Sequence, residues 1–96
     1  MKITTRIQAI IDRANYAYYR SCYFKVMEDD PETADNIRDY ARTSWHQCSG
    51  ERLGYIAVLG ILGINLNEAG LISYEEALND ARKDYEARKY AERKYR

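Results

Sequence analysis

The residues best suited to metal binding or nucleophilic chemistry are the two cysteines and the single histidine, Cys22, Cys48 and His46. His46 and Cys48 are two residues apart in a segment with helical periodicity, so their side chains point about 160° apart, whereas metal ligands on one helix need a spacing of three or four. The same geometry places His46 almost opposite the apolar seam that contains Cys48, so no base is held beside a thiol nucleophile. We therefore expect no metal site, no catalytic residues, and a surface-exposed His46.

Acidic and glycine-rich segments add no further catalytic signature. The carboxylates between Glu28 and Asp39 gather around a helix start and along a polar face, where no apolar surroundings raise a carboxyl pKa for acid–base catalysis. Gly60-Ile61-Leu62-Gly63 follows a helix instead of a strand and precedes no phosphate-loop lysine. The sequence thus predicts a non-enzymatic protein without a cofactor. Both cysteines lie among apolar neighbours, which is typical of free thiols in a reducing compartment.

The elements that must position any binding site are helices, because apolar residues recur at alternating spacings of three and four. In the first helix, about residues 4–27, this seam consists of Ile3, Ile7, Ile10, Ala14, Ala17, Ser21 and Phe24. In the second, about residues 31–62, it consists of Ala34, Ile37, Ala41, Ser44, Cys48, Tyr55, Leu59 and Leu62. The second seam keeps its register across Gly50 and Gly54, so we expect one continuous helix, straight or bent near Gly50.

Capping residues fix the expected helix boundaries. Asp30 and Pro31 predict the start of the second helix, because aspartate caps well and proline fits the first helical position. Gly63 predicts its end. Ser73-Tyr74-Glu75-Glu76 is a capping box that opens a third helix, about residues 74–95, with a seam of Tyr74, Leu78, Ala81 and Tyr85. The sequence predicts one all-α domain over residues 1–96, in which two long helices form a hairpin and the C-terminal helix packs alongside.

Tyrosine is the unusual feature of the composition, with ten residues against one phenylalanine and one tryptophan. Tyr16, Tyr19, Arg20 and Tyr23 share one strip of the first helix, roughly 160° from the middle of its apolar stripe, and Ala9, Arg13 and Met27 extend this strip. Tyrosine and arginine are enriched at the centres of protein interfaces. The strip is therefore the candidate partner-binding surface. It can instead be covered by the third helix as a second core layer, or stack on bases or a nucleotide.

The C-terminal run from Arg88 to Arg96 interleaves basic and aromatic residues. Arg88, Lys89, Arg93 and Lys94 are candidate contacts for phosphate or for an acidic partner. A solvated helix end whose cations complement the helix dipole explains the same pattern. Within the chain, its natural partner is the acidic segment between Glu28 and Asp39.

One face of the second helix carries mainly glycine and alanine, so its side chains are small. Gly50 and Gly54 are four residues apart, and Ala57, Gly60 and Gly63 follow. Since each glycine inside a helix costs roughly 1 kcal/mol relative to alanine, their concentration predicts close approach of another helix, within the chain or across a homodimer.

The segment from Gly50 to Ile64, with its Leu-Gly-Ile triplet, resembles the second-helix segment of short helical proteins encoded by phages and prophages. The resemblance covers about 15 residues and transfers no site residue. It implies that the chain inhibits or adapts a host protein by stoichiometric binding. A defence nuclease is one such target, and sequestration of a signalling nucleotide is an alternative.

Charge and hydropathy limit the classes of partner. Fifteen basic and fifteen acidic residues cancel, which argues against general attraction to nucleic acid or to an anionic membrane. The most apolar stretch, Leu53 to Leu66, is shorter than the roughly 20 residues that span a bilayer. We expect a cytoplasmic protein, in the host cytoplasm if it is phage-encoded, that binds a protein partner or itself as a homo-oligomer. A nucleotide or nucleic-acid binder that uses the Tyr/Arg surface is the alternative.

Overall fold

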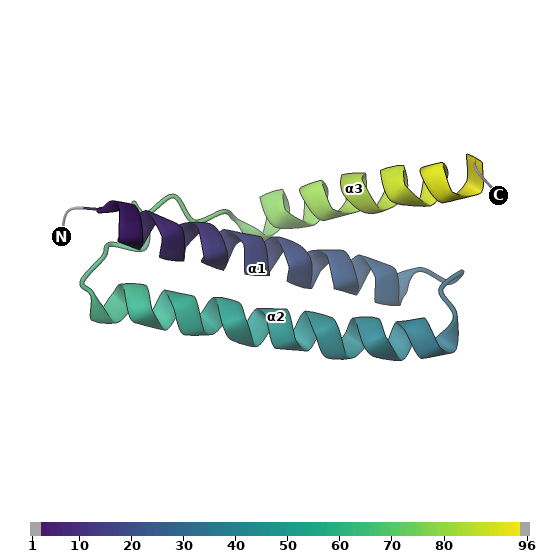
Figure 1. Cartoon of the computed structure of the whole chain (residues 1–96), viewed down its shortest axis with the longest axis horizontal. Coiled ribbons are helices and arrows are strands. Elements are labelled where there is room, and N and C mark those ends of the chain that lie inside the picture. The colour runs from purple at the N-terminus through teal and green to yellow at the C-terminus, as the bar shows by residue number, and fades with distance from the viewer. Residues whose placement is uncertain (1–2, 95–96) are drawn as a thin grey trace.

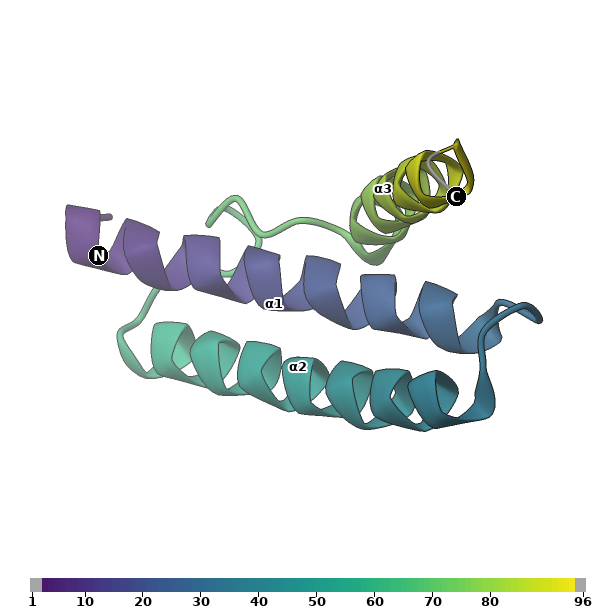
Figure 2. The ribbon, with the colours of Figure 1, turned by 45° about the vertical axis from the view of Figure 1, so that its right-hand side comes forward.

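The computed structural model describes residues 3–94 and consists of three helices, α1 (Thr5–Asp29), α2 (Asp35–Ile61) and α3 (Tyr74–Lys94). α1 and α2 form an antiparallel hairpin, and α3 packs on the side of α1 that faces away from α2 (Figures 1 and 2). The molecule is elongated, with extents of 51 × 23 × 20 Å. The predicted all-α architecture, a helical hairpin with a C-terminal helix alongside, is confirmed.

The core of the hairpin lies at the end where α1 begins and α2 stops. Ile7 and Ile11 of α1 pack there with Leu59 of α2 and with Ile64 and Ala69 of the following connection. Farther along the hairpin the core narrows to small residues, because Ala14, Ala17 and Ala41 occupy the helix contact. Ser21 is the buried polar residue of this contact, and its hydroxyl is satisfied by the carbonyl of Trp45 at 3.0 Å and the hydroxyl of Ser49 at 2.6 Å.

α2 runs without interruption through Gly50 and Gly54, as the unbroken register of its apolar seam predicted. It ends in a Schellman motif at Gly63, which adopts a φ of +77°. The amide of Ile64 donates to the carbonyl of Leu59, and that of Gly63 donates to Gly60. Within the described range, no helix is both long and apolar enough to cross a bilayer.

α3 approaches α1 closely through two alanines. Ala77 and Ala81 are fully buried and pack with Cys22 of α1, while Leu78 and several tyrosines surround them. The sequence placed Tyr74 in this seam, but its ring is mostly exposed and contacts only the edge of the interface, against Tyr18. The prediction for Tyr74 was wrong because Ala77 and Ala81, with Leu78 beside them, occupy the centre of the contact with α1, and this leaves Tyr74 at its border.

The start of α2 also differs from the prediction. The helix begins at Asp35 instead of Pro31, and its N-cap, Ala34, makes no capping hydrogen bond through its side chain. The carboxylate of Asp30 does accept the amide of Glu32 through Oδ1 at 3.0 Å, while Oδ2 accepts from Tyr85 and Lys89 of α3, but the backbone enters the helix only at Asp35. Residues 30–34 therefore form a turn, in which Thr33 donates to the carbonyl of Met27.

Asn15 attaches the connection between α2 and α3 to the middle of α1. Its side-chain amide donates to the carbonyl of Gly70 at 3.1 Å, and its side-chain oxygen accepts from the amide of Ile72 at 2.9 Å. One residue thus pairs with two backbone groups just before α3 begins. The serine hydroxyl of the predicted capping box follows, accepting from the amide of Glu76 at 3.1 Å. Asn15 and Ser73 together set where α3 starts and which face meets α1.

Replacing Asn15 with alanine should destabilise the fold by about 1 to 3 kcal/mol, mainly because the partly buried amide of Ile72 loses its acceptor, while the exposed carbonyl of Gly70 can bond to water instead. Urea unfolding followed by circular dichroism measures this change. Asn79→Ala, on the exposed face of α3, is the matched control and should change the free energy of unfolding by less than about 0.5 kcal/mol. Equal effects of the two substitutions would show that Asn15 does not hold the connection.

Candidate functional site

α3 divides the predicted tyrosine strip of α1 into a covered and an exposed part. The hydroxyl of Tyr19 donates to Asp84 of α3 at 2.5 Å, and the ring of Tyr23 packs edge-on against Tyr85 at 5.7 Å. Tyr16 remains 62% exposed, with its ring stacked on that of Tyr19. Burial and the neighbouring Asp84 carboxylate both raise the pKa of Tyr19, so its phenol stays protonated as a donor. The interface with α3 thus uses Tyr19 and Tyr23.

The exposed part of the strip continues onto α2. The guanidinium of Arg20 lies over the ring of Tyr16 at 5.8 Å and over that of Phe24 at 5.5 Å. Phe24 in turn contacts Tyr40 of α2 edge-on at 5.8 Å. We define the Arg/Tyr face as this row together with the arginines that precede it on α1, namely Arg6, Arg13, Tyr16, Arg20, Phe24 and Tyr40.

The three arginines of the Arg/Tyr face form a line. Arg6, Arg13 and Arg20 are spaced by seven residues, which places them on one side of α1 at steps of about 10.5 Å. None of them lies within 4.0 Å of a carboxylate oxygen in the part of the chain that the structure describes. By contrast, Lys25 of the same helix pairs with Asp29 at 3.2 Å. The line is therefore a source of positive potential in a chain whose net charge is zero.

The basic end of α3 is largely neutralised from within. Lys89 pairs with Asp30 at 2.8 Å and with Glu32 at 2.7 Å, and Arg93 pairs with Glu32 at 2.6 Å. These are the contacts with the acidic segment that the sequence suggested. Arg88 donates to the hydroxyl of Tyr23 at 3.2 Å and pairs with Glu92, and Lys94 is exposed in the last helical turn. Of the four predicted phosphate contacts, two are thus committed to carboxylates beside α1.

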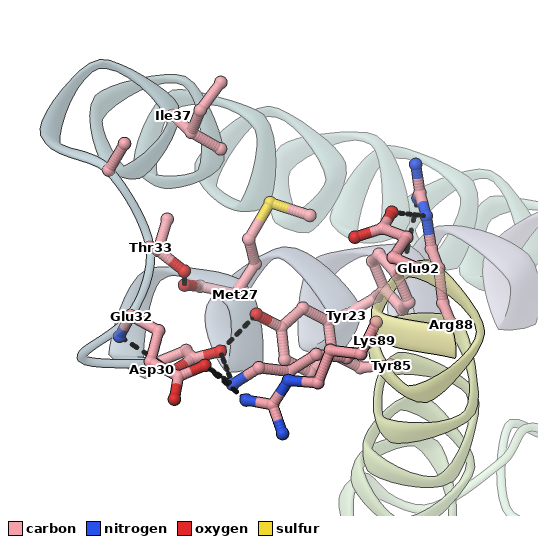
Figure 3. A pocket seen from close by; sticks show the side chains of 12 residues that line it. Tyr23, Met27, Asp30, Glu32, Thr33, Ile37, Tyr85, Arg88, Lys89 and Glu92 are labelled. Carbon is pink, nitrogen blue, oxygen red and sulfur yellow. Dashed lines mark hydrogen bonds and ion pairs between the residues drawn. The ribbon is translucent and has the colours of Figure 1, made fainter. Parts of the chain in front are cut away.

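A cavity of about 420 Å³ opens between the end of α1, the turn that follows it, and the C-terminal half of α3 (Figure 3). Met27 and Ile37 supply apolar wall, and the rings of Tyr23 and Tyr85 border the side toward α3. The charged groups on its rim are balanced, with three cations of α3 beside the carboxylates of Asp30, Glu32 and Glu92. The cavity therefore lacks the excess of one charge that would favour an ionic ligand.

Asp30 joins α3 to the hairpin at this cavity. Its carboxylate accepts hydrogen bonds from Tyr85 at 2.5 Å, from Lys89 at 2.8 Å and from the amide of Glu32 at 3.0 Å. These donors, led by Lys89 and Tyr85, lower the pKa of Asp30 from 3.8 to about 2. The same arrangement raises the pKa of Tyr85, whose phenol is partly desolvated and faces the carboxylate.

The cysteines and the histidine lie as their spacing predicted. Cys22 and Cys48 are buried free thiols, and burial raises the pKa of each. His46 is exposed on α2 and stacks on Trp45, with 3.6 Å between ring centroids. Residues 3–94 hold no group of three or more histidine, cysteine, aspartate or glutamate side chains arranged for a metal ion.

The sequence predicted only part of the Arg/Tyr face, although the spacing of its arginines is a signal that the sequence contains. The seven-residue spacing of Arg6, Arg13 and Arg20 is visible in the sequence, but only Arg13 and Arg20 were assigned to the strip. Phe24 was assigned to the core seam, whereas its ring is only partly buried and extends the exposed row. The pairing of Tyr19 with Asp84 spans 65 residues and has no local signal.

Comparison with protein-family models, with curated proteins and with solved structures finds no match for this chain.

Lowering the pH should weaken the attachment of α3. Because the pKa of Asp30 is lower in the folded chain than in the unfolded one, the ionised carboxylate stabilises the fold above about pH 4, and this contribution disappears as the pH falls toward about 2. Melting temperatures measured by circular dichroism from pH 6 to pH 2 report the loss.

Asp30→Asn should lower the melting temperature at pH 6. Below pH 4, the melting temperature of this variant should fall less than that of the wild type. Asp80→Asn is the control, because Asp80 is exposed on α3 and takes part in no ion pair within residues 3–94. A pH profile of Asp30→Asn that parallels the wild-type profile would contradict the assignment of Asp30 as the titrating group.

Proposed function

We propose that this chain is a non-enzymatic binding protein that forms a stoichiometric complex with a protein partner through the Arg/Tyr face. The observation that carries the proposal is the line of three unpaired arginines beside the exposed ring of Tyr16. A protein that binds its partner without catalysing a reaction acts as an inhibitor or as an adaptor. The resemblance of the Gly50–Ile64 segment to phage-encoded helical proteins suggests a host protein, including a defence protein, as the partner and the host cytoplasm as the location.

The charge of the Arg/Tyr face defines the kind of partner. Arg6 and Arg13 are exposed and Arg20 is half-buried, so an approaching acidic surface can reach all three cations. Ion pairs with a partner would add attraction without breaking a pair inside this chain. Complementary charge mainly raises the rate and specificity of association. The expected partner therefore presents carboxylates along about 21 Å of its surface, the distance from Arg6 to Arg20.

The aromatic rings give the same face a means of holding a partner once it has arrived. The rings of Tyr16 and Phe24 hold the guanidinium of Arg20 in place before binding. The Arg20 side chain therefore loses less conformational entropy when a complex forms. Tyr16 and Tyr40 offer large exposed rings on either side, at 62% and 59% exposure. The outer side of a helix is convex, which suits the surface of another protein better than a small ligand that needs an enclosing cavity.

A single-stranded nucleic acid is the second candidate partner. Arginines at steps of about 10.5 Å next to a stackable tyrosine also fit a chain of phosphates with unstacked bases. Zero net charge weakens this alternative, because general electrostatic attraction dominates most nucleic-acid binding.

Reversing the charge of Arg13 and Arg20 tests the proposed surface. The double variant Arg13→Glu/Arg20→Glu should lose a bound protein partner by at least tenfold in quantitative affinity purification from host lysate. Arg82→Glu/Lys83→Glu is the matched control, because it changes the net charge by the same amount on exposed residues of α3. A partner retained equally by both variants would contradict the Arg/Tyr face as the binding surface.

Native mass spectrometry of the reconstituted complex should then give a fixed ratio of the partner to this chain. Fluorescence anisotropy with a labelled single-stranded oligonucleotide separates the two candidates. The partner is a nucleic acid if the wild type binds the oligonucleotide in a salt-sensitive way, only the Arg13→Glu/Arg20→Glu variant loses this binding, and no protein is retained from lysate. That outcome would contradict a protein partner.

A further inference from the structure

The C-terminal half of α2 presents an apolar surface to solvent. Its inner side packs on α1 through Cys48 and Leu59, which are 4% and 0% exposed. The opposite side carries three large aliphatic residues, Leu53, Val58 and Ile61, at 60%, 43% and 85% exposure. We define the α2 outer face as these three side chains together with the small residues between them, namely Gly50, Leu53, Gly54, Ala57, Val58 and Ile61.

Nothing in the described part of the chain covers the α2 outer face. α3 contacts α1 but not α2. A Cβ atom placed on Gly50, Gly54 or Gly60 would meet no heavy atom within 4 Å. These glycines therefore do not serve close packing inside the monomer, although each one weakens the helix relative to alanine. The helix stability lost at these glycines is explained if a second helix approaches the α2 backbone from outside.

We propose that a second copy of this chain covers the α2 outer face, with the two α2 helices antiparallel about a two-fold axis at Gly54. Around this axis Gly54 lies opposite its counterpart, Gly50 lies opposite Val58, and Gln47 lies opposite Ile61. Gly50 of each helix thus leaves room for Val58 of the other. A two-fold interface must be self-complementary in this way, because the same patch serves both sides.

Charge favours a second copy in this orientation. All six residues of the α2 outer face are uncharged, so two such faces meet without charge repulsion. The overlapping segments also contain Glu51, which is exposed beside the face, and Arg52, whose guanidinium lies over the Tyr18 ring of α1 at 3.8 Å. In the other half of α2, the carboxylates of Asp35 and Asp39 are 100% and 78% exposed, and each pairs with an arginine of the same helix, at 3.7 Å for Arg38 and 3.9 Å for Arg42. A parallel arrangement would bring the two Asp39 side chains together. The antiparallel one separates them by roughly 45 Å, since each lies fifteen residues from the axis.

The small contact is typical of weak, reversible complexes. Residues 47–61 of each α2 overlap in this arrangement, a length of about 22 Å and the width of one helix. Such a contact is at the small end of specific protein interfaces, which points to a dissociation constant in the micromolar range. The dimer should therefore dissociate on dilution. It does not depend on the proposed function, because the Arg/Tyr face lies on other residues.

Sedimentation equilibrium of the full chain from about 1 to 200 μM tests the dimer. The wild type should move from 11.3 kDa toward twice that mass over this range. Gly54→Glu should remain monomeric, because it places two carboxylates against each other at the axis. It should keep the helical circular dichroism of the wild type, since glutamate favours helix more than glycine does and meets no neighbour in the monomer.

Asn79→Glu is the control variant, with the same charge change on the exposed side of α3, and it should dimerise like the wild type. A wild type that stays monomeric at 200 μM would overturn the proposal, including the case in which a different protein occupies the face. Dimerisation of Gly54→Glu with wild-type affinity would overturn the assignment to this face.

Disulfide trapping tests the orientation. Gly54→Cys should form an intermolecular disulfide under mild oxidation, because the two positions meet at the axis. Thr43→Cys should not, since an antiparallel pair holds these two positions roughly 33 Å apart. Efficient cross-linking through position 43 would show a parallel pair and overturn the proposed axis. Cys22 and Cys48 are buried and should stay reduced in both variants.

Discussion

The dominant constraint on this fold is that a single helix, α1, provides the packing surface for both of its neighbours. α2 and α3 share no contact within the described residues, so no core is enclosed by all three helices. Ile11 and Leu59 are the largest fully buried side chains. Apart from the aliphatic cluster around Ile11 and Leu59, the helix contacts consist of a thin layer of small side chains, and each helix keeps an outer side that the described residues do not cover.

Small residues and polar contacts compensate for this limited burial. Ala77 and Ala81 bring α3 close to α1, where apolar area alone is modest. Hydrogen bonds then fix the position of α3 along its length, from Asn15 at its start through Tyr19 and Asp84 to Asp30 near its end. Polar contacts of this kind are directional, so they specify one placement of α3 among several that would bury similar area. They also make that placement sensitive to the ionisation of a few carboxylates.

Local signals in the sequence predicted the helices, whereas their mutual contacts required the structure. Gly63 and Ser73 act within a few residues, and each does what its backbone preference or hydroxyl predicted. The predicted start of α2 was wrong by four residues: Asp30 accepts the amide of Glu32 as a cap would, but it closes a turn there and also binds side chains 55 and 59 residues away, and the helix begins only at Asp35. Whether the tyrosine strip was core or surface was equally non-local, since it depended on where α3 lies. The strip proved to be both, with Tyr23 turned to α3 and Tyr16 exposed.

The two uncovered surfaces have different chemistry and therefore suit different roles. The α2 outer face is uncharged and fits a copy of itself, whereas the Arg/Tyr face is cationic on both copies and would repel its own counterpart. A dimer formed through α2 leaves α1 and its arginines on the outside and presents two of these faces on one particle. A partner that is itself symmetric could then be held at both points, which strengthens binding without any new contact. Dimerisation would also stabilise each thin monomer by mass action, because only the folded chain presents the α2 outer face.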